Sequence, residues 1–68
     1  MKLSARNKIP ATITEIKKGE ATANVVMEAS GLRLVASVTV EAVQELGLTE
    51  GSQVTAVIKA SDVILAVD

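Results

Sequence analysis

Apolar and polar residues alternate along much of this chain, as is typical of strands that have one face on a core. Across Ala21–Ala29 every odd-numbered residue is Ala, Val or Met, and apolar residues again recur at every second position across Leu32–Val40. A period of two residues predicts a strand for each segment. Ser30 and Gly31 lie between them as a turn, so the two strands are predicted to pair antiparallel in a meander.

A first strand is predicted upstream of this pair. Ile9–Ile16 is rich in β-branched residues, and Pro10 is tolerated because it lies close to the start of the segment. Lys17–Glu20 follows as a turn, in which Gly19 is expected to supply a positive φ.

The period of the pattern lengthens after residue 39. Val40, Val43 and Leu46 fall at spacings of three, which predicts a short helix over residues 40–48. Thr39 stands where its hydroxyl can cap the first turn, and Gly47 stands where a helix commonly ends.

Two more strands are predicted downstream of the helix. Gln53–Ala60 alternates with its even-numbered residues inward, Ser61–Asp62 breaks the pattern, and Val63–Val67 is predicted to be a short fifth strand. Three strands, a short helix and two strands follow the order of an OB-type barrel. We therefore predict an all-β fold, a five-stranded OB-like small barrel with one short helix between strands 3 and 4. We expect it to form a single domain over residues 1–68.

The composition predicts an oligomer. The 68 residues are 49% hydrophobic but include no Phe, Trp, Tyr, Cys or His, so the core must be aliphatic and no disulfide can form. The same absence leaves no usual zinc ligands, and we expect no direct metal ligand from the protein. Domains this short are usually stabilised by disulfides, by a structural metal or by association with another subunit. Only association between copies remains for this chain.

The sequence also limits where the protein can be located and which classes of function it can have. The segment Met1–Lys8 lacks the apolar run of a signal peptide, and no stretch approaches a membrane span, so we expect a cytoplasmic protein without membrane contact. Without His, Cys or Tyr there is no familiar base or nucleophile, and we predict no catalytic residue and no enzyme activity. A net charge of −1 and the absence of aromatic residues argue against nucleic acid as a partner.

Two short polar segments could bind a ligand. Ser4–Asn7 precedes the first predicted strand, and Lys59–Ser61 lies where the fourth strand breaks. Each offers a cation, a hydroxyl and a small alanine that lets the backbone approach a ligand, which suits a tetrahedral oxyanion. Spacing alone favours the alternative that Arg6 and Lys59 are ordinary solvated charges.

The two segments together resemble the signature of the molbindin (Mop) family, an OB-like TOBE/Mop domain. Ser-Ala-Arg-Asn-Lys over residues 4–8 and Lys-Ala-Ser over residues 59–61 are similar to that family's motifs near its two ends. Glu41–Leu48 is similar to the family's helix, so the resemblance covers the whole chain. Lys8 stands where the family commonly has Gln, and Ala42 where it often has Ser.

The resemblance implies molybdate or tungstate as the bound ligand, held at sites between subunits. It implies a homo-oligomer, a hexamer that is a trimer of dimers with exchanged strands. By position, the oxyanion would be bound where one chain faces another, through Ser4, Ala5 and Arg6 of one and Thr39, Lys59, Ala60 and Ser61 of the other. The family has a second class of site on its threefold axis, for which Lys17, Lys18 and Gly19 are candidates, although a solvated turn explains them as well.

These observations lead to two functional hypotheses. The first is intracellular binding and storage or buffering of molybdate or tungstate. The alternative is an anion-responsive sensory or interaction module that acts through a partner protein.

Overall fold

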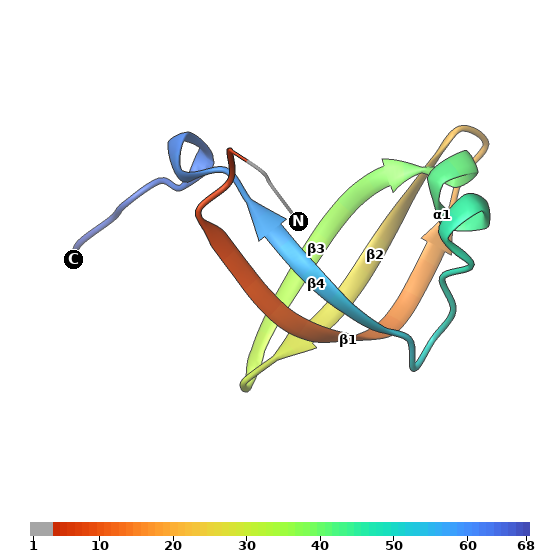
Figure 1. Cartoon of the computed structure of the whole chain (residues 1–68), viewed down its shortest axis with the longest axis horizontal. Coiled ribbons are helices and arrows are strands. Elements are labelled where there is room, and N and C mark those ends of the chain that lie inside the picture. The colour runs from red at the N-terminus through yellow and green to blue at the C-terminus, as the bar shows by residue number, and fades with distance from the viewer. Residues whose placement is uncertain (1–3) are drawn as a thin grey trace.

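The computed structural model describes residues 4–68 and shows a twisted sheet with one short helix (Figure 1). Residues 1–3, part of the segment examined for a signal peptide, lie outside the described residues. The elements in chain order are β1 (Asn7–Lys18), β2 (Thr22–Ala29), β3 (Leu32–Thr39), α1 (Val40–Leu46), β4 (Gln53–Ile58) and the 3₁₀ turn η1 (Ala60–Asp62). The prediction of a mostly β fold with a helix between the third and fourth strands is confirmed.

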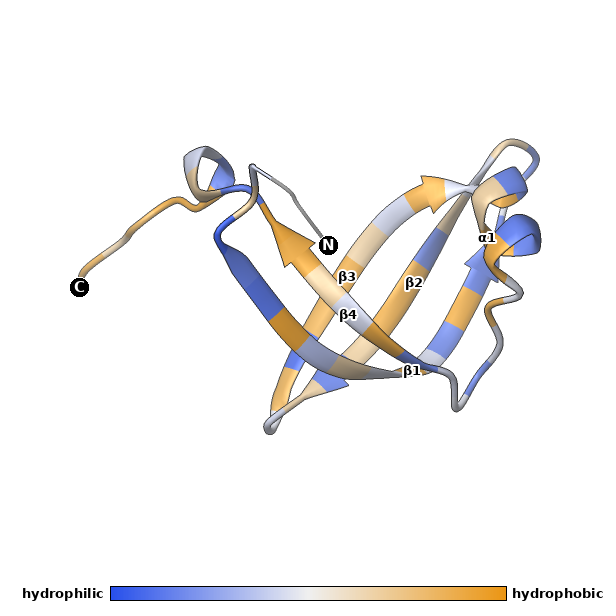
Figure 2. Ribbon diagram, in the orientation of Figure 1, coloured by the Kyte–Doolittle hydropathy of each residue, from blue (hydrophilic) through white to orange (hydrophobic). Residues whose placement is uncertain are grey.

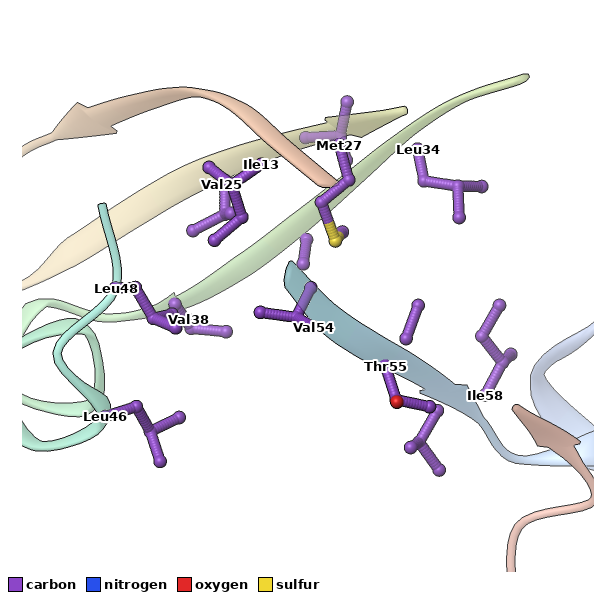
Figure 3. Close-up of a pocket in the computed structure, with 14 residues that line it drawn as sticks. Ile13, Val25, Met27, Leu34, Val38, Leu46, Leu48, Val54, Thr55 and Ile58 are labelled. Atoms are coloured by element: carbon purple, nitrogen blue, oxygen red, sulfur yellow. The ribbon is translucent and has the colours of Figure 1, made fainter. Parts of the chain in front are cut away.

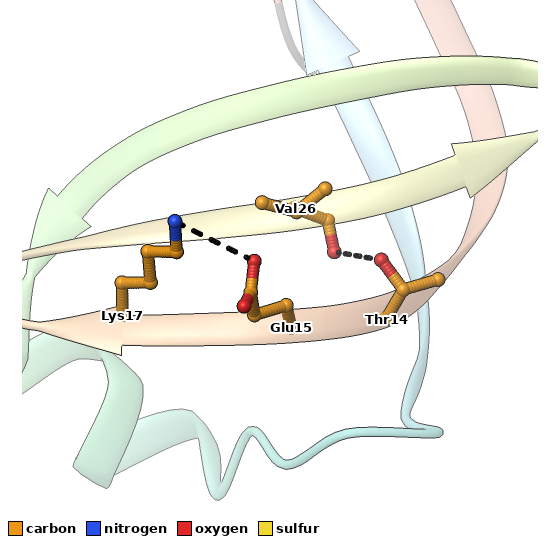
Figure 4. A network of polar contacts seen from close by, with 4 residues as sticks. All are labelled: Thr14, Glu15, Lys17 and Val26. Carbon is orange, nitrogen blue, oxygen red and sulfur yellow. Dashed lines mark hydrogen bonds and ion pairs between the residues drawn. The ribbon is translucent and has the colours of Figure 1, made fainter.

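The long strand β1 organises the sheet, whose order is β3-β2-β1-β4. Its first half pairs antiparallel with β4, and its second half pairs antiparallel with β2. A register shift falls at Thr14, whose hydroxyl donates to the carbonyl oxygen of Val26 at 3.2 Å (Figure 4). A bulge of this kind bends a strand and increases its twist, which lets one strand serve two neighbours that diverge.

The core lies on the concave side of this sheet and is entirely aliphatic apart from one methionine. Alternation in β2 is confirmed, because its odd-numbered residues are buried. Figure 2 shows hydrophobic and hydrophilic bands along the strands of the sheet. Val26 departs from the pattern, since it is also buried although it faces the other way. The buried cluster comprises Ala11, Ile13, Ala23, Val25, Met27, Ala29 and Val43.

Both predicted caps of α1 are confirmed. The hydroxyl oxygen of Thr39 accepts the N–H of Ala42 at 3.0 Å, and Gly47 adopts φ 63°. The N–H of Gly47 donates to Gln44 and that of Leu48 donates to Val43, the pairing of a Schellman motif.

The helix ends at Leu46, two residues before its predicted end, and Leu46 itself does not join the core. Leu46 is 72% exposed, because the left-handed residue at Gly47 ends the helix and turns the chain. Leu48 packs against the core in its place.

The two hairpins use glycine for different reasons. Between β2 and β3, Ser30 has φ 51° and Gly31 has φ 82°, as a type I′ turn requires, and Glu28 accepts the N–H of Gly31 at 2.7 Å. The predicted positive φ at Gly19 is wrong. Gly19 instead donates its N–H to the Thr22 carbonyl, and an added Cβ would lie 3.1 Å from that oxygen, so close approach selects glycine there.

The predicted fifth strand does not form within the single chain, and the sheet remains open. Residues 63–68 have no secondary structure and extend away from the sheet, exposed along their length (Figure 1). Strands β3 and β4 are left as the two edges, so the barrel is not closed. The tail leaves η1 at the far end of β4 and meets neither edge of its own chain.

Replacing Ser30 with Asn should stabilise the protein. Asn tolerates a left-handed conformation better than Ser, so we expect the free energy of unfolding to rise by roughly 0.5 kcal/mol. Ser30→Val should lower it by about 1–2 kcal/mol, because a β-branched side chain resists positive φ. Urea denaturation at matched protein concentration measures both, and an unchanged Ser30→Val midpoint would contradict the strain argument.

Candidate oxyanion-binding site

The two polar segments singled out in the sequence lie together at one end of the sheet. Asn7, the first residue of β1, pairs with Ile58, the last residue of β4. Ser4–Arg6 therefore precede this pair and Lys59–Ser61 follow it, so antiparallel pairing brings segments more than 50 residues apart side by side (Figure 1). The structure thus places six of the seven residues predicted for the main site within one neighbourhood of a single chain. The predicted division of Ser4–Arg6 and Lys59–Ser61 between two chains is therefore wrong, because the β1–β4 pairing already joins the two segments.

The backbone holds the second segment in a compact turn. Lys59 leaves the strand in an extended conformation, and its carbonyl accepts the N–H of Asp62 at 2.9 Å. The carbonyl of Ala60 accepts the N–H of Val63 at 3.2 Å. The side chains of Ser4, Arg6, Lys59 and Ser61 are all exposed, so within one chain this is an open donor-rich surface rather than a closed cavity.

This end of the molecule is locally positive. Residues 4–8 and 58–62 include three cations, Arg6, Lys8 and Lys59, against one carboxylate, Asp62. A chain with a net charge of −1 therefore concentrates positive charge where its hydroxyls gather. Hydroxyl and N–H donors beside a small excess of cations are suited to an oxyanion.

Asn7 belongs to the first polar segment but is not among the residues predicted to bind the ligand. Its side-chain Nδ2 donates to the Ile58 carbonyl oxygen at 3.2 Å, and the residue is half-buried. The sequence carried a signal for this role, because an amide stands directly after Arg6 at the start of a strand that is rich in β-branched residues.

Thr39 is not brought to these segments within one chain. It ends β3 at the opposite end of the sheet, where it pairs with Thr22 and caps α1. Because its hydroxyl oxygen already accepts the Ala42 N–H, its own proton is the group left to donate to a ligand. A site containing both Thr39 and Lys59 therefore needs more than one copy of the chain.

The candidates for a second site, Lys17, Lys18 and Gly19, lie near Thr39 rather than near Lys59. Nζ of Lys17 lies 3.9 Å from Oε1 of Glu15 in an exposed ion pair (Figure 4), which contributes little to stability. Residues 15–22 and 39–45 include two lysines and four glutamates, so the local charge is negative. This charge balance offers less to an anion than the end of the sheet that contains Lys59.

A separate groove of about 300 Å³ opens between β3 and β4 (Figure 3). Its walls are aliphatic except for Met27 and Thr55, so it lacks the donors that an anion needs. The residues that line it are Ile13, Val25, Met27, Leu34, Val35, Ala36, Val38, Leu46, Leu48, Val54, Thr55, Ala56, Val57 and Ile58.

Residues 4–68 also bear on two other kinds of partner, a metal ion and a membrane. Over that range no group of three or more His, Cys, Asp or Glu side chains could hold a metal ion. In the same part of the chain, no helix is both long enough and apolar enough to cross a membrane.

Comparison with known proteins places the chain in a family. Residues 3–65 match the model of the TOBE domain. The chain belongs to the TOBE domain family. This TOBE domain is 42% identical over 66 residues to molybdenum-pterin-binding protein 1 of Clostridium pasteurianum, covering 96% of this chain and 97% of the relative. The resemblance to the molbindin (Mop) family is thereby confirmed.

Solved structures agree with that assignment. The TOBE domain superposes on a molybdate-binding protein from Sporomusa ovata with TM-score 0.94 and 44% identity, covering 97% of this chain and 98% of that one. It matches the cytoplasmic molybdate-binding protein ModG, solved with molybdate bound, with TM-score 0.95 and 45% identity. The match covers 100% of this chain and 49% of ModG.

Thr39→Ala should destabilise the TOBE domain through loss of the cap of α1. We expect the free energy of unfolding to fall by about 1 kcal/mol, because the Ala42 N–H loses its acceptor. Thr39→Ser keeps the hydroxyl and should stay within a few tenths of a kcal/mol of the parent. Thermal and urea unfolding compare the three proteins, and equal stability of the Ala and Ser variants would contradict a capping role.

Proposed function

We propose that this protein binds molybdate or tungstate reversibly and serves as an intracellular store or buffer of the anion. The observation that carries the proposal is the meeting of Ser4–Arg6 with Lys59–Ser61 at a locally positive end of the sheet. The TOBE family assignment and the two structural relatives described as molybdate-binding proteins support the choice of oxyanion.

The ligand chemistry follows from the donors. A tetrahedral dianion carries four oxygens, each an acceptor, and burying it without partners would cost many kcal/mol. Hydroxyls of Ser4 and Ser61 and backbone N–H groups beside Ala5 and Ala60 supply neutral donors, while Arg6 and Lys59 offset the charge. Binding needs no covalent step, which agrees with a carrier rather than an enzyme.

The site is proposed to close between copies of the chain. Within one chain these donors are exposed to water, so they are screened and cannot enclose an anion. A second copy would cover them and bring Thr39, which lies at the far end of its own sheet. Ligand binding would then stabilise the assembled state.

The exposed tail supplies a means of association. Val63, Ile64, Leu65 and Val67 are 49–98% exposed, and the aliphatic groove between β3 and β4 is unfilled in the single chain. We propose that residues 63–67 of one copy lie along the groove of another as the fifth strand of its barrel. Exchange of tails in this way gives a dimer, and three dimers give the proposed hexamer. A cytoplasmic location, as described for ModG, suits such a store.

Titration calorimetry with molybdate, tungstate and sulfate tests the function. Molybdate and tungstate should bind with similar affinity and sulfate much more weakly, because a site with several neutral donors and few cations should select an anion by size and shape more than by charge. Lys59→Ala should raise the dissociation constant for molybdate about ten- to a hundredfold by removing a charge-assisted hydrogen bond. Oligomer mass is checked first, so that lost assembly is not mistaken for lost binding.

Lys17→Ala is the matched control for that substitution. It also removes one exposed lysine, but from the glutamate-rich end of the sheet, and should change the dissociation constant less than threefold. Equal affinity of Lys59→Ala and the parent protein for molybdate would contradict the proposed site. Failure of the parent protein to bind molybdate would contradict the proposed function.

Leu65→Asp should weaken assembly. A carboxylate at this position cannot enter an aliphatic groove, and loss of one buried leucine removes about 1.5–3 kcal/mol per tail. Light scattering at micromolar concentration should show a smaller particle than the parent. Leu46→Asp tests the groove wall in the same way, whereas Glu50→Gln on the exposed turn before β4 should leave the mass unchanged. An unaltered mass for Leu65→Asp would contradict tail exchange.

A further inference from the structure

The hydrogen bond from the Asn7 side chain to the Ile58 carbonyl oxygen lies beside the proposed ligand-binding residues but is not itself a contact to the ligand. Within residues 4–68 this is the side-chain hydrogen bond that joins β1 to β4, and it lies at the last paired position of the two strands. The next residues outward are Arg6 on one strand and Lys59 on the other. The bond is therefore made at the base of both donor segments.

The acceptor of this bond determines what the bond controls. The Ile58 carbonyl belongs to the same planar peptide unit as the N–H of Lys59, and in a trans peptide the two groups point in opposite directions. Fixing the carbonyl oxygen on the Asn7 amide therefore turns the Lys59 N–H away from β1, toward the open edge of β4. It also sets the direction in which the chain leaves the strand for η1.

The same contact restrains the other segment. Ser4–Arg6 lie outside any element of secondary structure, and their first ordered neighbour in the chain is Asn7. Because the Asn7 side chain is hydrogen-bonded to the Ile58 carbonyl, the backbone at Asn7 is held against β4. This restraint limits how far Ser4–Arg6 can move. Segments ordered before the ligand arrives lose less conformational entropy on binding.

We propose that Asn7 is a positioning residue of the oxyanion site, whose amide locks the Ile58–Lys59 peptide and keeps both donor segments aligned in the ligand-free protein. This inference rests on the proposed function for its effect on affinity. Its effect on order does not depend on any ligand, so the two ideas fail separately.

Asn7→Ala and Asn7→Asp test the contact in complementary ways. Asn7→Ala removes the bond, and the dissociation constant for molybdate should rise about three- to tenfold. Asn7→Asp sets a carboxylate oxygen against a carbonyl oxygen and adds a negative charge beside the anion, so the rise should exceed tenfold. Asn24→Asp, at the chain's one other asparagine, makes the same change on an exposed part of β2 and should alter the constant less than twofold.

Backbone ¹⁵N relaxation of the ligand-free protein separates positioning from direct ligation. In Asn7→Ala the order parameters of residues 4–6 and 59–61 should fall, while those of the β1–β4 pairs from Ile9 to Thr12 stay at the parent's values. Weaker binding with unchanged order would overturn the inference, because Asn7 would then be a direct ligand. Unchanged binding with unchanged order would overturn it as well. If the parent protein does not bind molybdate, the proposed function is wrong and the predicted effect of Asn7 on affinity is wrong as well. The predicted effect of Asn7 on backbone order is still tested by the relaxation measurement.

Discussion

The architecture depends on β1 pairing with two different strands along its length. Ladder bonds to β4 in its first half and to β2 in its second half require the strand to twist, and the bulge at Thr14 provides that twist. The hydroxyl of Thr14 satisfies the Val26 carbonyl where the regular ladder is interrupted. The bend lets β4 and β2 follow different directions along one strand, and the aliphatic groove opens between β3 and β4.

The same strand separates two kinds of surface. Apolar residues from β1, β2 and α1 collect on the concave side around Ile13 and Val43, the most deeply buried large side chains. Hydroxyls and cations collect where β1 begins and β4 ends. A small sheet without aromatic residues can thus offer an aliphatic surface on one side and a polar surface at one end, and the proposed association of copies would link the two.

Much of the fold could be predicted from the sequence because local patterns determine it. Alternation identified β2 and β3, and the hydroxyl of Thr39 and the glycine at position 47 marked both ends of α1. Predictions failed where a contact distant in sequence decides the outcome: close approach to Thr22 explains Gly19, and Val63–Val67 finds no strand edge in its own chain. For the site, motif resemblance named Arg6 and Lys59, but their proximity follows from the Asn7–Ile58 pair, which spacing alone does not reveal.

The open edges of the sheet have a consequence for protein quality control. Natural edge strands are usually protected by lysines, prolines or inward charges against indiscriminate pairing. Strand β3 has one charged residue, Arg33, and β4 has none, while the adjoining tail is a run of aliphatic residues. The single chain therefore leaves two edges on which amyloid-like pairing could begin, and whatever covers both edges would also protect the protein from aggregation.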